Sequence, residues 1–598
     1  MARVVRDSDT RQPAGANEWH WLILAGALVV VLTFTSVVIN ASLLAGGKPL
    51  RINPIAAVLG VITGDIQLGL ASWIAGAFLV VLVAAVSMVA LKSKKKARQS
   101  PTAARAARVM ARPAELGSLA GKEAHSKAQR LYPAANPKDD PLSIGLMIGK
   151  TVAKPETTLW MSWEDTAVVL AGQRMGKTQA YVTTSILGAP GACVATANKR
   201  DVVDLTRAGR EEKGKVWIFD LQHIATTGQR TWWWNPLDQV HSVADARKLA
   251  NYFASATRGD AAKADPYFDS AAQELLAVYI LAAAKGGGDL VHVLEWLNSD
   301  QDETPVEILR ASGESAAAHS ASSSIHTNPR QKEGFFKMAL NFIACLTDSN
   351  YASAVTPEQR VMLSVEGGEI VAEKSGLGGD DTLPKFDPIA FATSTDTVYA
   401  LSVEGPDSPA PLTTALVGQI IDAGQKVARQ IVGGRLETPM VCVLDEAANV
   451  VRLQELPSLY SYCGSQGIVL LTFLQSRSQA QRQWGRDGAR AMMESSNFII
   501  YGGGIKDKEF LAEISSIIGN MRVERTSSSR GSHINYNTSY EKEEILGVDD
   551  LAAVSAAEAI IISSGNRPTL TKKIFWSDSP FKDVVEGSMR QAKREQGG

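Results

Sequence analysis

Residues 166–189 read TAVVLAGQRMGKTQAYVTTSILGA. An apolar, β-branched run at 167–170 leads into a turn that contains glycine, and the residues after the turn have the spacing of an amphipathic helix. This order of strand, loop and helix favours phosphate binding, because the free backbone N–H groups at a helix N-terminus point toward an anion. The stretch therefore predicts an α/β fold organised around a phosphate-binding loop.

The loop matches the GxxxxGK[ST] pattern except at its first position, where Ala171 stands in place of glycine. We expect Lys177 to neutralise the β and γ phosphates and Thr178 to bind magnesium, so ATP and Mg2+ are the predicted cofactors. A strand-to-helix turn that contains Gly-Lys-Thr by chance is the alternative. The residues expected to bind nucleotide are Ala171, Gly172, Gln173, Arg174, Met175, Gly176, Lys177, Thr178 and Gln179.

A second motif follows the apolar run 440–444, which ends in Asp445 and Glu446. Ligands of an open parallel sheet bind outside the carboxyl ends of its strands, so an acidic pair at such an end faces the phosphates. We expect Asp445 to bind Mg2+ and Glu446 to polarise the attacking water. Strands that end in Asp-Glu are common, so the argument depends on the pairing with the loop. Together the two motifs predict an ATP hydrolase.

The next apolar strand, 467–474, ends at Gln475, whose amide is expected to contact the γ phosphate or the attacking water. A surface glutamine that merely follows a strand is an equal alternative. The catalytic residues predicted from the sequence are Lys177, Glu446 and Gln475, and the predicted metal ligands are Thr178 and Asp445.

The two nucleotide motifs are farther apart in the chain than in a minimal P-loop domain, so the sequence predicts an insertion between them. The segment from about 245 to 380 has apolar residues at spacings of three and four, which is typical of helices. We therefore expect an all-α insert. Further core strands are expected at 191–197, 215–221, 396–405, 497–504 and 559–568.

Two uncharged runs near the N-terminus, 21–47 and 66–91, are long enough for membrane spans, which need roughly 20 apolar residues. Lysine and arginine are dense from 92 to 112 and sparse between the runs, which favours both termini on the cytoplasmic side. The predicted location is the inner or plasma membrane, with more than one pass. A cleaved signal peptide is the alternative for the first run.

The composition says little about a partner. The formal net charge of −1 gives no field strong enough to indicate nucleic acid. The four cysteines lie far apart in apolar or small-residue runs, which is typical of reduced core thiols rather than of a disulfide framework or a zinc site. They are Cys193, Cys345, Cys442 and Cys463.

These observations predict the following domain organisation. We expect a cytoplasmic N-terminus (1–20), a transmembrane hairpin (21–91, with spans at about 21–45 and 70–91), a basic juxtamembrane linker (92–155), the first part of a nucleotide-binding domain (156–245), an inserted all-α domain (246–380), the second part of the nucleotide-binding domain (381–582) and a C-terminal tail (583–598).

With these motifs in place, the chain resembles the type IV coupling proteins, the TraG/TraD-like ATPases of conjugation and type IV secretion systems. The resemblance covers most of the chain from about 156 to 581. The family usually has glycine where Ala171 stands. The resemblance rests on the paired N-terminal runs, on GQRMGKT and the following ACVATANKRDVVDLT, on WNPL at Trp234, on PYFDSAAQELL, on LDEAAN at Leu444, on FLQSRSQ at Phe473 and on SSGNRPTL at Ser563.

The resemblance implies a RecA-like P-loop NTPase domain with an inserted all-α domain, a homo-hexameric ring, and delivery of relaxase-bound single-stranded DNA or protein effectors to a type IV secretion channel. It assigns Lys177 and Thr178 to the Walker A loop, Asp445 and Glu446 to Walker B, and Gln475 to the glutamine after the next strand. No match assigns an arginine finger, and Arg522 and Arg525 are guesses. The sequence leaves open whether the cargo is DNA or protein.

Two other functions compete with this interpretation. A chromosome-partitioning DNA pump would share the anchor and the core, but such pumps normally lack a long helical insert between the motifs. A nucleotide-binding docking scaffold with little turnover is the alternative that Ala171 motivates.

Overall fold

The computed structural model describes residues 106–226, 230–257, 266–374, 382–405, 408–530 and 534–597, together with scattered residues between 36 and 77. The chain divides into two units, Met1–Ser100 and Pro101–Gly598. In the first unit, Ile39, Leu43 and Ile66 form a small buried cluster.

The predicted membrane location is contradicted by the structure. Among the described residues, no helix is both long and apolar enough to cross a bilayer, which takes roughly 20 residues. Most of the two predicted spans, about 21–45 and 70–91, lies outside the described residues.

The second unit is built on one mixed sheet of 11 strands, in the order β2-β1-β15-β14-β11-β3-β10-β9-β4-β8-β5. The seven strands from β11 to β5 are parallel to their neighbours, and β14, β15, β1 and β2 extend the sheet in antiparallel fashion. The strands are β1 Leu146–Thr151, β2 Thr158–Met161, β3 Ala167–Leu170, β4 Cys193–Ala197, β5 Val216–Asp220, β8 Thr397–Leu401, β9 Met440–Leu444, β10 Ile468–Leu474, β11 Phe498–Tyr501, β14 Glu558–Ser563 and β15 Thr569–Lys572.

Helices cover both faces of this sheet, which explains why its central strands read as unbroken apolar runs. In β3, Val169 packs on one face with Ile186 of α6 and Val202 of α7. Its neighbours Val168 and Leu170 pack on the other face. The helices over the sheet are α5 Gly121–Leu131, α6 Thr183–Gly188, α7 Asp201–Glu211, α15 Pro388–Ala392, α16 Ala410–Gln430, α17 Ala447–Val450, α18 Leu456–Leu459, α19 Arg477–Ser495, α20 Lys508–Ile518, α21 Val548–Ala552 and α22 Lys582–Gly597.

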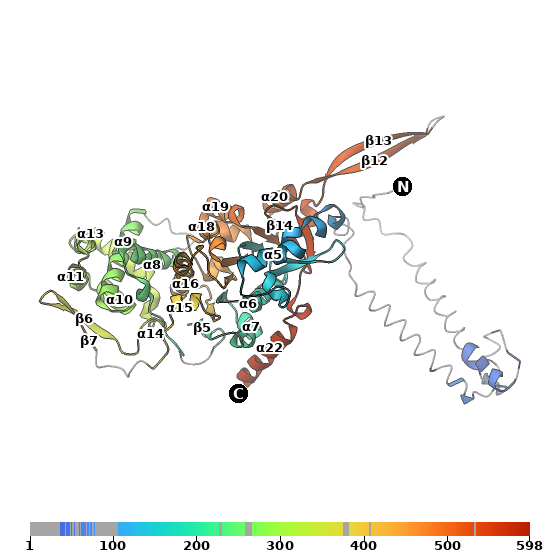
Figure 1. The fold of residues 1–598 in the computed structure, drawn as a ribbon, viewed down its shortest axis with the longest axis horizontal. Helices are drawn as coiled ribbons and strands as arrows, with labels where there is room; N and C mark the ends of the chain where they lie inside the picture. Colours follow the sequence, from blue (N-terminus) through green and yellow to red (C-terminus); the bar gives the residue numbers. More distant parts are fainter. Residues whose placement is uncertain are drawn as a thin grey trace. The chain divides into compact units, whose positions relative to one another are not determined.

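A group of helices follows β5 and packs together beside the core, with α16 at the junction (Figure 1). Its first helix, α8, contacts both α9 within the group and α16 of the core. The helices are α8 Val243–Thr257, α9 Pro266–Gly286, α10 Leu290–Asn298, α11 Thr304–Ala311, α12 Ser315–Ile325, α13 Pro329–Phe342 and α14 Ser349–Ser353.

The segment predicted as all-α is not entirely helical. It also contains an antiparallel pair, β6 Val361–Glu366 and β7 Glu369–Lys374. The turn between them is Gly367–Gly368, and both glycines have positive φ, as a two-residue hairpin turn requires. Alternation of partly buried and exposed residues along β6 is the strand signal that the helical reading of this segment overlooked.

Two other stretches are more ordered than expected. The predicted linker 92–155 contains α5 and β1, and its Leu131 and Ile148 are buried in the core. The predicted tail 583–598 forms α22, which packs on α7 and buries Val585. In both stretches a few apolar residues are enough to stabilise the helix or strand, because the sheet and α7 already offer an apolar surface to pack against.

Two long strands, β12 Asn520–Arg530 and β13 Ile534–Glu544, form a separate ribbon. The ribbon extends away from the sheet (Figure 1).

Candidate nucleotide-binding site

The predicted motifs lie at one edge of the sheet. β10 is parallel to β3 on one side and to β9 on the other, with Leu474 paired to Leu170 and Thr472 paired to Leu444. The three strands therefore end side by side. Because each motif follows the carboxyl end of its strand, the loop after β3, the acidic pair after β9 and Gln475 after β10 meet at this edge.

Lys177 contacts both predicted acidic residues. Its ammonium lies 2.7 Å from Asp445 Oδ1 and 2.6 Å from Glu446 Oε1. All three side chains are largely buried, with 11% of the lysine side chain exposed and 8% of each carboxylate side chain. One cation thus bridges two carboxylates that would repel each other if it left.

This bridge shifts the ionisation of its members. Burial would lower the pKa of Lys177, but the charges of Asp445 and Glu446 outweigh burial and raise it. Burial raises the pKa of Asp445 against the pull of Lys177, and the neighbouring Glu446 carboxylate acts in the same direction as burial. The lysine therefore stays charged.

The backbone at the acidic pair is strained. Glu446 has φ 52° and ψ 39°, the left-handed region that glycine favours. The carbonyl of Asp445 accepts a hydrogen bond of 2.8 Å from the Thr196 hydroxyl on β4, which holds the turn from the neighbouring strand. Strain of this kind costs on the order of 1–3 kcal/mol and is typical of functional sites.

Gln475 joins the same cluster. Its side-chain amide donates to Glu446 Oε1 at 2.7 Å, and its carbonyl oxygen accepts a weaker bond of 3.4 Å from the amide of Gln173 in the loop. The position after β10 thus contacts both the acidic pair and the predicted phosphate loop.

The loop itself has the tight turns that phosphate binding requires. Gly176 has φ 75°, and Arg174 has φ 60°, an uncommon value for a residue with a side chain. A π-helical turn, Thr178–Val182, follows the loop and continues into α6. Met175 and Gln179 were also predicted to bind nucleotide. Met175 lies before this π-helical turn, and Gln179 lies within it.

Ala171, the departure from the usual pattern, is accommodated by a glycine. Its methyl group is buried, and a side chain at Gly502 would approach it to 2.8 Å. The backbone of the loop also lies close to the glycines after β11: the Gly172 N–H donates to Gly503 O at 2.9 Å, and a Cβ at Gly172 would lie 2.2 Å from Gly504 O. The three glycines 502–504 thus leave room for the loop.

Two contacts of this site were not predicted from the sequence. Thr196 lies in an apolar strand, where nothing distinguishes it from a core threonine. Lys573 reaches the loop from the end of β15, and its ammonium lies 2.7 Å from Met175 O. The triple glycine directly after an apolar strand was the one available signal of close backbone approach. Arg522 and Arg525 lie on β12, not on an element of this edge.

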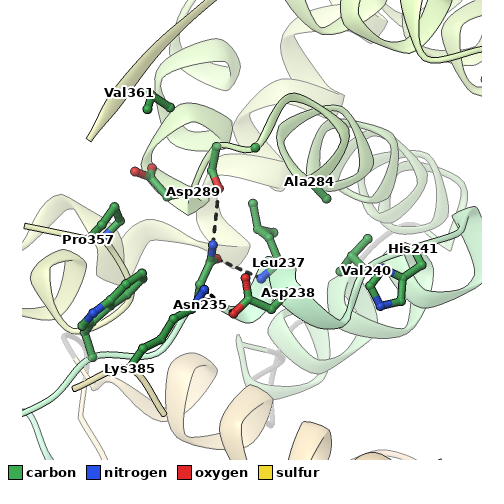
Figure 2. Close-up of a pocket in the computed structure, with 13 residues that line it drawn as sticks. Asn235, Leu237, Asp238, Val240, His241, Ala284, Asp289, Pro357, Val361 and Lys385 are labelled. Carbon is green, nitrogen blue, oxygen red and sulfur yellow. Dashed lines mark hydrogen bonds and ion pairs between the residues drawn. The ribbon is translucent and has the colours of Figure 1, made fainter. Parts of the chain in front are cut away.

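A separate cavity of about 340 Å³ lies where the helical group joins the core (Figure 2). Asn235, from the WNPL motif, accepts a bond from Leu237 N at 3.0 Å and donates one to Gly288 O at 3.4 Å. Lys385 pairs with Asp238 at 2.6 Å. None of the predicted nucleotide residues lines this cavity.

The fold is α/β with a large mixed sheet, and the candidate nucleotide site lies at the carboxyl ends of its parallel strands. Two family profiles match it: "Type IV secretory system Conjugative DNA transfer" over residues 116–356 and "TraM recognition site of TraD and TraG" over residues 439–556. Together with the relatives below, these matches support a place for the chain in the type IV coupling protein family.

The curated relatives are type IV secretion system-coupling proteins VirD4. The protein from Bartonella quintana (strain Toulouse) is 29% identical over 158 residues, and that from Bartonella henselae is 28% identical over 158 residues. Each alignment covers 25% of this chain and 25% of the relative, so the chain spans a quarter of the length of the relatives it matches.

The solved structure "Bacterial conjugative coupling protein TrwBdeltaN70" superposes with a TM-score of 0.50 and 14% identity. The match covers 72% of this chain and 90% of that chain. It supports the α/β fold with a large mixed sheet.

Proposed function

We propose that this chain is a motor that hydrolyses ATP and uses the energy to recruit and move DNA or protein into a type IV secretion or conjugation channel. The single observation that carries the proposal is the cluster of Lys177, Asp445, Glu446 and Gln475, brought together from three strand ends. A cation for phosphate, a carboxylate for metal and a carboxylate for water activation are the parts that phosphoryl transfer to water requires.

The residues present fit a nucleotide with magnesium. The loop offers backbone N–H groups at a helix start, and the buried carboxylates already hold one cation, the Lys177 ammonium. Thr178 and Asp445 supply the oxygen donors that Mg2+ prefers. Bound magnesium would neutralise charge on the phosphate oxygens. Lys177 would move from the carboxylates to the phosphates, and Glu446 would then be free to accept a proton from water.

The docking scaffold with little turnover has less support than the motor. Ala171 motivated that alternative, but Gly502 accommodates its methyl group and the loop keeps its tight turns. The partitioning pump is disfavoured by the helical group between the motifs, since such pumps normally lack one.

The test is steady-state ATP hydrolysis by the purified full chain, with and without single-stranded DNA. We expect turnover that depends on magnesium and rises when DNA is present. Tight nucleotide binding without turnover would favour the scaffold. Turnover that protein cargo stimulates and DNA does not would assign a protein cargo.

We further propose a ring, with homo-hexamer as the expected form, because RecA-like sites are completed by charge from a neighbouring subunit. Activity per subunit should then rise with protein concentration. An activity that stays constant over a wide dilution series of monomeric protein would contradict the ring.

We also propose that the helical group recognises the cargo, the relaxase or an adaptor, since insertions on a rigid scaffold commonly carry recognition. The deletion should begin after α8, because Tyr252 of α8 hydrogen-bonds to Asp422 of α16 at 2.7 Å. Replacement of 266–374 by a Gly/Ser linker should preserve binding of an ATP analogue and abolish transfer in cells. Normal transfer by the variant would contradict a recognition role, and loss of the oligomer would indicate that these helices hold the ring together.

A further inference from the structure

Lys573 follows β15 directly and its ammonium is buried beneath the phosphate loop. It donates to three backbone carbonyls, Met175 O at 2.7 Å, Gly502 O at 2.8 Å and Ala556 O at 3.1 Å. Only 6% of the residue is exposed. The three acceptors belong to the loop, to the segment after β11 and to the segment before β14, so one side chain ties three parts of the site together.

The contact with Met175 constrains the loop through the geometry of the peptide bond. In a trans peptide unit the C=O and the N–H point in opposite directions. The Met175–Gly176 bond is trans, because the cis bond among the described residues is Lys154–Pro155. The unit that carries the Met175 carbonyl also carries the Gly176 N–H. Because Lys573 holds the carbonyl, this N–H points away from the lysine. Gly176 immediately precedes Lys177, so its N–H belongs to the set that phosphate binding requires.

The neighbouring packing leaves the loop little freedom to turn this unit over. A Cβ at Gly176 would lie 2.8 Å from the ring of Phe575, two residues after Lys573. A Cβ at Gly503 would lie 2.7 Å from the Met175 side chain. The loop is therefore clamped between the end of β15 and the glycines after β11.

Burying a charged lysine costs much free energy if its only role is to donate hydrogen bonds to backbone carbonyls. Among the described residues, no acidic side chain lies within ion-pairing distance of it. Burial lowers the pKa of Lys573 to about 8, with Glu558 on β14 acting in the opposite direction. The other charged residues on the segments packed around it are Arg174 and Lys177 in the loop and Lys506 and Asp507 after β11. Costly buried cations cluster at functional sites.

We propose that Lys573 is a positioning residue for the nucleotide: it presets the Met175–Gly176 peptide so that the loop receives phosphate without rearrangement. This inference rests on the proposed function. Lys573 touches no reacting atom and acts through the loop backbone, so its loss should weaken nucleotide binding more than it slows hydrolysis of bound nucleotide.

The adjacent lysine provides a matched control. Lys572 pairs with Glu156 at 2.6 Å on the surface and does not reach the loop. We expect Lys573→Met in the full chain to raise the dissociation constant of a fluorescent N-methylanthraniloyl-ATP by about tenfold or more, while kcat falls less than threefold. Lys572→Met should match the wild type. Equal affinity of wild type and a folded Lys573→Met variant would overturn the proposal, and so would an effect confined to kcat.

A second readout needs no substitution at this position. A neutral amine has two N–H bonds for three carbonyls, so deprotonation removes one contact. The affinity of the wild type and of Lys572→Met for the fluorescent nucleotide should therefore fall as the pH rises from about 7 to about 9. This range brackets the Lys573 pKa of about 8. A flat profile over this range would overturn the proposal even if Lys573→Met does not fold. If the wild type binds no nucleotide at any pH, the proposed function itself fails, which is a different result.

Discussion

The Lys177 ammonium lies 2.6 Å from Glu446 Oε1, and the Gln475 amide donates to that same oxygen at 2.7 Å. Without nucleotide, the proposed phosphate-binding cation is therefore held by the proposed general base. In the proposed mechanism, Lys177 would leave Glu446 before either side chain acts. Lys177 would then exchange one ion pair for another and would not become an unpaired buried charge, which would be costly.

The Lys177 and Glu446 roles can be separated by substitution. Lys177→Ala should weaken ATP binding, because the phosphates lose their cation. Glu446→Gln should preserve binding and lower kcat by about 100-fold or more, the range expected for a general base. Both are measured by binding of an ATP analogue and by steady-state hydrolysis. Glu437→Gln, on the exposed approach to β9, is the control. Wild-type hydrolysis by Glu446→Gln would remove Glu446 from the mechanism.

Gln475→Ala should lower kcat by roughly tenfold and change KM little, because its amide orients Glu446 and contributes no charge to binding. Gln481→Ala on α19 provides the control, since Gln481 is on the same segment beyond the site. A Gln475→Ala variant with a raised KM and an unchanged kcat would instead indicate that the amide binds ground-state phosphate.

Arg210 should be important for stability. Its guanidinium is fully buried and donates to the Thr397 hydroxyl at 2.6 Å and to Ala189 O at 2.7 Å, with further bonds to Gly191 O and Thr395 O. Arg210→Met should lower the free energy of unfolding by about 3 kcal/mol or more, because several buried carbonyls lose their donor.

Arg207 on the same helix is the control for that measurement. It forms partly exposed pairs with Glu211 and Glu595, which are typically worth about 1 kcal/mol or less. Chemical denaturation of both variants should give clearly different losses. Similar small losses for Arg207→Met and Arg210→Met would show that the buried guanidinium is not needed.

Acid should destabilise the helical group through Asp289. Burial would raise the pKa of Asp289, but hydrogen bonds from His292 and Arg360 outweigh burial and hold it at about 2. A carboxyl whose pKa is lowered by folding stabilises the fold above its unfolded value near 3.8, and this contribution is lost as the pH falls toward about 2. Fluorescence of Trp296, whose ring lies 5.9 Å from that of His292, should report the change.

Asp289→Asn tests this assignment, because an amide has no such titration. The variant should be less stable than the wild type at pH 7, and the difference should shrink between about pH 4 and about pH 2. A difference that is independent of pH would show that another group controls the acid transition.

The sequence alone determined the class of the fold and the residues of the candidate site. Gly176, Lys177 and Thr178 are a contiguous motif, and Asp445 with Glu446 follows an apolar run, so local patterns were enough to predict the loop and the acidic pair. The apolar runs predicted the parallel strands because strands buried on both faces have little polar interruption.

Tertiary structure decided what local patterns cannot encode. Lys573 is far from the loop in sequence and looks like its surface neighbour Lys572, yet the antiparallel end of the sheet brings it under Met175. The β6–β7 hairpin formed in a segment read as helical because a Gly-Gly turn allowed its strands to pair. Contacts between distant segments depend on which strands become neighbours, and strand order is a property of the whole sheet rather than of any one stretch of sequence.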